Sequence, residues 1–221
     1  IRNICDIIVA KGNHMYSVTR YHICRNRHPG LFDYCSLMSR KSKLLRNAAL
    51  FRVRQWFTAY GKDKLQPNQK EVINEVLLTC KLSGRKKPGK VINYYFLEKL
   101  MRCTENPDYL NGLPSQTAQW VLKGVCFDFK SWLKALEAYY EDPTDFTGKP
   151  KMPEYCKNDL HSFTITNQEC RIYRREDGSS YLHFPKTEET IDVIVPENAV
   201  LKEVKVIPYC GDFMIAVTFD N

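Results

Sequence analysis

The sequence lacks any long hydrophobic run. Its longest unbroken apolar segment, residues 213–217, has only five residues, whereas a membrane-spanning helix needs about 20. We therefore expect a protein that does not span a membrane and has no membrane partner.

Disulfide and zinc-ribbon patterns are also missing. The nine cysteines are odd in number, widely spaced and never arranged as CxxC, which argues against both frameworks. Free cysteines fit a reducing compartment, so we expect a cytoplasmic protein.

Cys24 and His28 have the spacing of two zinc ligands, with His14, His22 and Cys35 nearby. No second ligand pair matches them, so we predict no metal site.

Catalytic signatures are absent as well. The chain contains no GxSxG, HExxH or Walker A sequence and no carboxylate pair at a recognisable spacing. We therefore expect no catalytic residues within these 221 residues.

What the sequence does contain is an uneven distribution of charge. The net charge is +8, but residues 1–110 hold 21 basic and 8 acidic side chains, whereas residues 111–221 hold 12 and 17. A basic half of this kind favours a polyanionic partner such as a nucleic acid. The 43% hydrophobic and 12% aromatic content is sufficient for a packed globular core.

The hydrophobic periodicity changes twice along the chain. Residues 4–9 and 15–24 alternate as two strands of a hairpin, and helical spacing follows over residues 37–60, 68–81, 91–103 and 115–141. After the prolines and glycines of 143–153, alternation returns near 162–167, 170–175, 180–184, 191–195, 201–207 and 213–219. We predict an α+β fold, with a helical subdomain (29–142) inserted in an antiparallel β-barrel formed by residues 1–28 and 143–221.

Two helix faces are candidates for contact with nucleic acid. Lys43, Arg46 and Arg54 share one face of a segment (39–54) that has six basic residues and no acidic one, and such a face can lie along a phosphate backbone. On the helix from 115, Trp120, Lys123, Phe127, Lys130 and Lys134 recur at spacings of three and four. Rings of this kind stack on unpaired bases while lysines contact phosphates.

Each face also has a simpler interpretation. The basic face is equally typical of a solvated surface. Trp120 and Phe127 could instead pack on a neighbouring helix. The basic loop 83–90, which contains Arg85, Lys86, Lys87 and Lys90, adds only weakly specific support for a phosphate contact.

Four segments together resemble the N-terminal half of proteins in the TnpB (OrfB) family. These are transposon-encoded RNA-guided nucleases, the relatives of type V CRISPR effectors. The segments are SRKSKLLRNAALFRVRQWF (39–57), LPSQTAQWVLKGVCFDFKSWLKAL (113–136), GKPKMPEY (148–155) and EVKVIPYCGDFMIAVTF (203–219). The resemblance covers most of the chain, although residues 1–38 depart from the shorter lead-in of many members.

The resemblance implies a recognition lobe formed by the helices and a wedge barrel formed by the strands, with a structured guide RNA and target DNA as partners. It implies an RNA-contacting set of Arg40, Lys43, Arg46, Asn47, Arg54, Gln55, Lys149, Lys151 and Tyr155. It further implies that the RuvC-like nuclease domain, with its Mg ions, follows this chain, which itself carries no cofactor. The alternatives are a non-catalytic RNA- or DNA-binding regulator derived from the family and a protein-interaction domain.

Overall fold

The computed structural model describes residues 4–11 and 14–220 and divides into two compact units. The first, called the β unit here, comprises Ile1–Lys43, Gly112–Ala118 and Asn158–Asn221. The second, the helical unit, comprises Leu44–Asn111 and Gln119–Lys157. The chain crosses between the units four times, and two of these crossings, after residues 43 and 118, fall inside α-helices.

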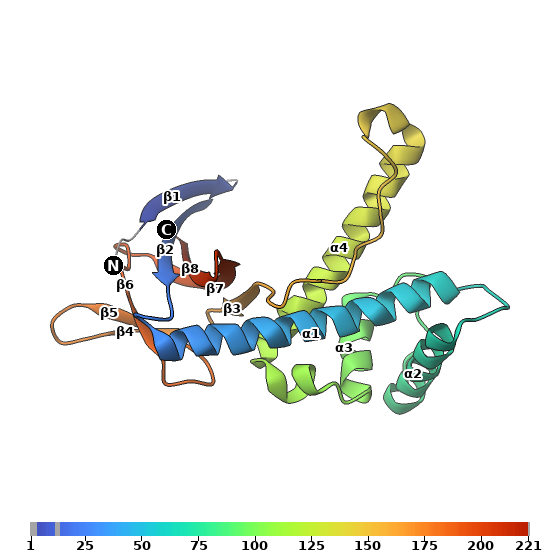
Figure 1. Cartoon of the computed structure of the whole chain (residues 1–221), viewed down its shortest axis with the longest axis horizontal. Coiled ribbons are helices and arrows are strands. Elements are labelled where there is room, and N and C mark those ends of the chain that lie inside the picture. Colours follow the sequence, from blue (N-terminus) through green and yellow to red (C-terminus); the bar gives the residue numbers. More distant parts are fainter. Residues whose placement is uncertain (1–3, 12–13, 221) are drawn as a thin grey trace. The chain divides into compact units, whose positions relative to one another are not determined.

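Two antiparallel sheets form the β unit (Figure 1). The larger has the order β1-β2-β8-β7-β3 and contains β1 (Ile4–Lys11), β2 (His14–Ile23), β3 (Phe163–Thr166), β7 (Val200–Tyr209) and β8 (Asp212–Asp220). The smaller has the order β4-β5-β6, from Arg171–Arg174, Ser180–His183 and Thr190–Val193. The chain therefore returns after its helices to pair β8 with β2.

The strands form because apolar residues alternate along them. In β8, Phe213, Ile215, Val217 and Phe219 are fully buried on one face, as expected for a sheet with one face in the core. A two-residue turn joins β7 to β8, and its residues Cys210 and Gly211 both have positive φ, at 48° and 85°. This is the backbone that a tight hairpin requires.

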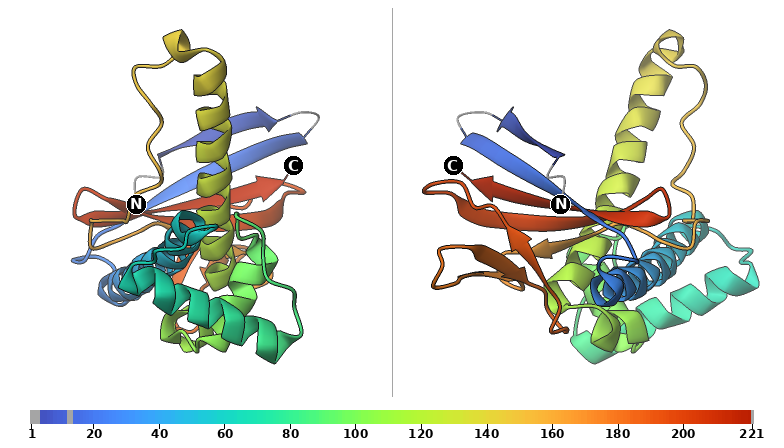
Figure 2. Two further views of the ribbon diagram at one scale, coloured as in Figure 1. Left: turned by 90° about the vertical axis from the view of Figure 1, so that its right-hand side faces the viewer. Right: turned by 60° about the vertical axis from the view of Figure 1, so that its left-hand side comes forward.

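The α+β class and the antiparallel pairing are confirmed, but the predicted barrel is not found. Among the described strands, the larger sheet ends at β1 on one side and β3 on the other, so the sheet is open (Figure 2). The strands β4–β6, which the barrel prediction included, form a separate sheet.

In the sequence, four α-helices separate strands β1 and β2 from strands β3 to β8. They are α1 (Pro29–Ala59), α2 (Pro67–Ser83), α3 (Tyr94–Cys103) and α4 (Ser115–Glu141). The predicted start of the first helix at 37 is wrong, because Pro29 begins it. Proline is favoured at the first helical position, where its missing N–H has no helical partner to lose. No described helix has the length and apolarity that crossing a membrane requires.

The helix α4 has an apolar stripe that is buried along its first half and more exposed toward its end. Leu122, Val125 and Phe129 are buried, whereas Trp132 and Leu136 are half-buried and Tyr140 is exposed. The carboxylate of Glu169 caps the start of α4, accepting the backbone N–H groups of residues 116 and 117 at 2.6 and 2.9 Å. A carboxylate here satisfies N–H groups that lack a helical partner and is favoured by the helix dipole.

Candidate nucleic-acid interface

The predicted basic face of α1 begins in the β unit. Arg40 is exposed. Lys43 is only 20% exposed, and its Nζ lies 3.4 Å from the Asp159 carboxylate. Lys41 donates to the carbonyl of Gly112 at 3.3 Å. Only Arg40 of these three side chains is therefore well presented to solvent.

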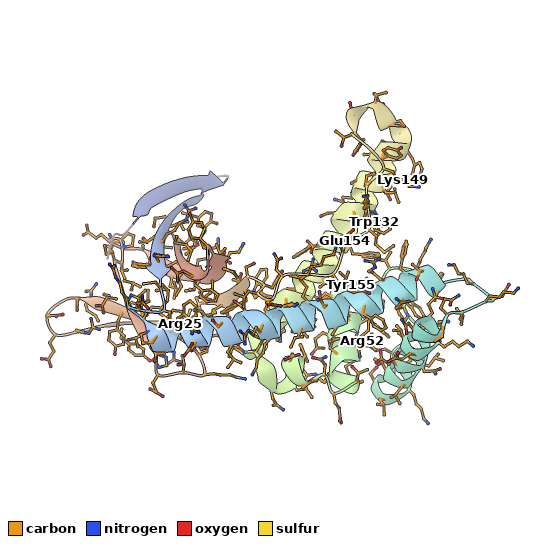
Figure 3. All side chains as sticks on the ribbon, in the orientation of Figure 1. Arg25, Arg52, Trp132, Lys149, Glu154 and Tyr155 are labelled. Carbon is orange, nitrogen blue, oxygen red and sulfur yellow. The ribbon has the colours of Figure 1, made fainter. Side chains whose placement is uncertain are left out.

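Further along α1, in the helical unit, the basic face is covered by the segment 148–157, which we call the strap. Arg46 is 15% exposed and binds the Asp128 carboxylate at 2.7 Å, and it also donates to the Glu154 carbonyl at 3.4 Å. Arg54 donates to the Pro153 carbonyl at 2.9 Å and lies over the Tyr155 ring. Both guanidinium groups are therefore engaged inside the unit. Glu154 and Tyr155 of the strap are labelled in Figure 3.

The strap is fastened at two further points. Asn47 donates to the Cys156 carbonyl at 3.0 Å and accepts the Cys156 N–H at 2.8 Å, so the amide replaces a β-ladder partner. At the other end, the Trp132 indole donates to the Pro150 carbonyl at 3.1 Å. The extended strap thus runs back beside α4 (Figures 1 and 2). Three of the side chains that hold its backbone, Arg46, Asn47 and Arg54, are ones that the sequence had suggested for RNA.

The remaining members of the predicted α1 and strap set are less enclosed. Gln55 is half-buried, whereas Lys149 and Lys151 are exposed. The Nζ of Lys149 donates to the Tyr140 hydroxyl at 2.6 Å, and this hydrogen bond raises the pKa of the lysine. Both strap lysines are therefore accessible to solvent.

The outward stripe of α4 is the most accessible part of the predicted set. Trp120 is 39% exposed and Phe127 is 57% exposed, while Lys130 and Lys134 are exposed beside them. Spacings of three and four residues place these side chains on one face of the helix. The stripe ends at Lys134, because Glu137 occupies the next position on this face.

The helix α3 extends this face with two tyrosines that the sequence analysis did not single out. Tyr95 is 69% exposed and its ring lies 5.3 Å from that of Tyr94. Lys123 connects them to α4, since its Nζ lies 5.3 Å from the Tyr94 ring and 4.8 Å from the Trp120 ring. The helical periodicity of the sequence could have identified Tyr95 as exposed, because it lies outside the buried positions 96, 97, 100 and 101 of its helix. We call this surface the aromatic–lysine face: Tyr94, Tyr95, Trp120, Lys123, Phe127, Lys130 and Lys134.

The helical unit that carries the aromatic–lysine face has a positive net charge. The helical unit contains 19 basic and 12 acidic side chains, a net charge of +7, whereas the β unit contains 14 and 13. Near Tyr94, the Glu98 carboxylate is already bound by Arg102 at 2.7 Å and by the Tyr109 hydroxyl at 2.6 Å. This acidic group is therefore compensated within α3 and its neighbouring turn.

The basic loop 83–90 packs on α1. The Trp56 indole donates to the Gly89 carbonyl at 2.8 Å, Lys87 lies over the Trp56 ring and Lys90 lies over the Phe57 ring. Arg85 and Lys86 are exposed at its start. The loop thus has a fixed base, and all four of its cationic side chains are exposed.

The Cys/His cluster near the start of the chain does not form a metal centre in the part of the chain that the structure describes. His22 pairs with Asp212 at 3.0 Å. Cys35 is fully buried, and burial raises the pKa of its thiol to about 12. No group of three His, Cys, Asp or Glu side chains suited to a metal gathers among the described residues. The side chain of His14 lies outside the described set.

No protein-family model and no curated protein sequence matches the chain. The candidate interface is therefore described from its own geometry. Four exposed or half-exposed rings alternate with lysines across two helices of a positively charged unit. Such a surface can stack on unpaired bases and neutralise the adjoining phosphates.

Proposed function

We propose that this chain is the guide-RNA and target-DNA binding part of a TnpB-like RNA-guided DNA endonuclease. In this proposal base pairing reads the sequence, and the protein contacts the backbone and unpaired bases. Cleavage belongs to a Mg-dependent nuclease domain outside these residues. The observation that carries the binding role is the aromatic–lysine face.

Both components of this face favour nucleic acid over a purely apolar partner. Exposed Trp120 and Phe127 offer ring surfaces that stack on bases of any sequence. Lys130 and Lys134 lie on the same face and can each release a counterion when they bind a phosphate. The net charge of +7 on the helical unit adds long-range attraction for a polyanion.

Binding to RNA tests this proposal directly. The purified chain, freed of co-purified nucleic acid, is titrated into a labelled RNA hairpin with an unpaired tail and into a matched DNA duplex. Replacing Trp120 and Phe127 by Ala should weaken binding to the tailed RNA by about 5- to 150-fold for each stacked base. The control is Tyr209→Ala, because Tyr209 on β7 is similarly exposed, at 53%. Absence of binding to either probe at moderate salt would refute the proposal.

A second candidate function is contact with an acidic protein. Leu77, Leu78 and Leu82 on α2 are 50%, 47% and 63% exposed, and the exposed Lys81 and Arg85 lie beside them in sequence. This patch fits a partner that presents apolar side chains among carboxylates. Binding of such a partner would survive nuclease treatment and weaken when Leu78 and Leu82 are replaced by Ser, whereas the RNA-binding role predicts no effect of that change on RNA affinity.

A further inference from the structure

The smaller sheet of the β unit has one buried and one outward face. Leu182, Ile191 and Val193 are buried on the inner face. The register pairs Tyr173 with Tyr181 and Tyr181 with Asp192, so these three residues share the opposite face, because side chains of paired positions lie on the same side. Aromatic rings from two adjacent strands therefore meet on the outward face.

These rings form a row across the outward face. The Tyr173 and Tyr181 rings are stacked, with centroids 5.5 Å apart and planes 23° apart. The His183 ring stands edge-on to Tyr173 at 6.4 Å, and the Arg175 guanidinium lies 4.7 Å from the Tyr181 centroid. Tyr173 is 43% exposed, so it offers solvent-accessible ring surface.

The charges around this row differ at its two ends. At the turn end, Arg175 pairs with Asp192 at 2.8 Å, and Asp177 lies in the same turn. At the other end, the exposed Arg171 is paired with His183 in the register. Arg171 is therefore the better placed cation for a phosphate.

We infer that the outward face of the β4–β6 sheet is a second base-stacking site, which takes an unpaired nucleotide of the RNA on Tyr173 with its phosphate near Arg171. The inference rests on the proposed function and adds a contact surface in the β unit. An antiparallel sheet that exposes rings on adjacent strands is a general solution for binding splayed-out bases. Arginine beside the rings supplies charge complementarity to the backbone.

A salt series separates the two contributions. Tyr173→Ile retains a residue that favours strands but removes the ring, and should weaken binding to the tailed hairpin by about 5- to 150-fold without changing the slope of log K against log salt. Arg171→Gln should reduce that slope by about 0.7, the contribution of one phosphate contact to a single strand. Neither variant should affect binding to the same hairpin without its tail. The control variants are Tyr209→Ala and Lys205→Gln, at exposed positions on β7.

Photocrosslinking tests the contact in the unaltered chain. With 5-bromouridine in the tail, the crosslinked peptide should include Tyr173. Two results together would overturn this inference: affinity of Tyr173→Ile for the tailed hairpin within twofold of the unaltered chain, and no crosslink in residues 171–183. If the Trp120 and Phe127 variant still loses affinity, the proposed function stands and only this inference fails. No RNA binding by the unaltered chain would overturn the proposed function and this inference together. Capture of an acidic peptide, but not RNA, by this face would also overturn it.

Discussion

The two exposed lysines of the α4 stripe offer a direct measure of phosphate contact. Replacing Lys130 and Lys134 by Gln removes two charges and leaves the rings of Trp120 and Phe127 in place. Each phosphate contact to a single strand contributes about 0.7 to the slope of log K against log salt, so the double variant should lower the slope by about 1.4. Between 50 and 200 mM salt, the ratio of the affinity of the unaltered chain to that of the double variant should fall about sevenfold.

The assay is fluorescence anisotropy with the tailed RNA hairpin at four or more salt concentrations. The matched control is Lys62→Gln with Lys205→Gln, since both lysines are exposed and their replacement removes the same net charge. If both double variants lowered the slope equally, attraction to the net charge would explain binding. An unchanged slope in the Lys130 and Lys134 variant would remove these lysines from the interface.

Two further predictions concern the helical unit itself. Replacing Asn47 by Ala removes both hydrogen bonds between its side chain and the backbone of Cys156. The change should lower the free energy of unfolding by about 1–3 kcal/mol, measured by urea denaturation, while proteolysis within 148–157 increases. Burial raises the pKa of Glu98, but hydrogen bonds from Tyr109 and Arg102 outweigh it and lower the pKa below its usual 4.5. The stability from Glu98 is thus fully present above about pH 4.5 and is lost as pH falls through the lowered pKa, so Glu98→Gln should flatten this acid dependence of unfolding.

Exposed residues provide the controls for both measurements. Arg40→Ala changes an exposed side chain of α1 and should leave protease sensitivity in 148–157 unchanged. Glu137→Gln removes an exposed carboxylate from α4 and should retain the acid dependence of the unaltered chain. An Asn47 variant as stable as the unaltered chain would show that the hydrogen bonds between Asn47 and the strap contribute nothing to stability.

Local patterns predicted the elements well because their causes are local. Alternation in segments such as 213–219 and the helical stripe of 115–141 depends on neighbouring residues, and the strands and helices appear near the expected positions. Pairing between β2 and β8 joins residues about 200 positions apart, and no periodicity encodes which strands meet. The barrel was therefore predicted from element order alone, and the separate β4–β6 sheet was not anticipated.

The candidate site was only partly predictable for a related physical reason. A helical wheel places Arg46 and Arg54 on a basic face, but it does not say whether their partners are phosphates or protein atoms. In the helical unit these partners are the Asp128 carboxylate and the carbonyls of Glu154 and Pro153. Exposure, which the sequence does not contain, distinguishes these arginines from the α4 lysines.

The contacts of the strap also change what the family resemblance implies for individual residues. Two of the four segments that carry it, 39–57 and 148–155, are bound to each other through Arg46 and Arg54. A shared need to fold the helical unit is therefore sufficient to explain why these two segments occur together, without any contact to RNA. The stripe of Trp120, Lys130 and Lys134 has no such explanation, because exposed rings and lysines on one helix face add little to packing. The case for nucleic-acid binding consequently depends on α4 more than on the basic face of α1.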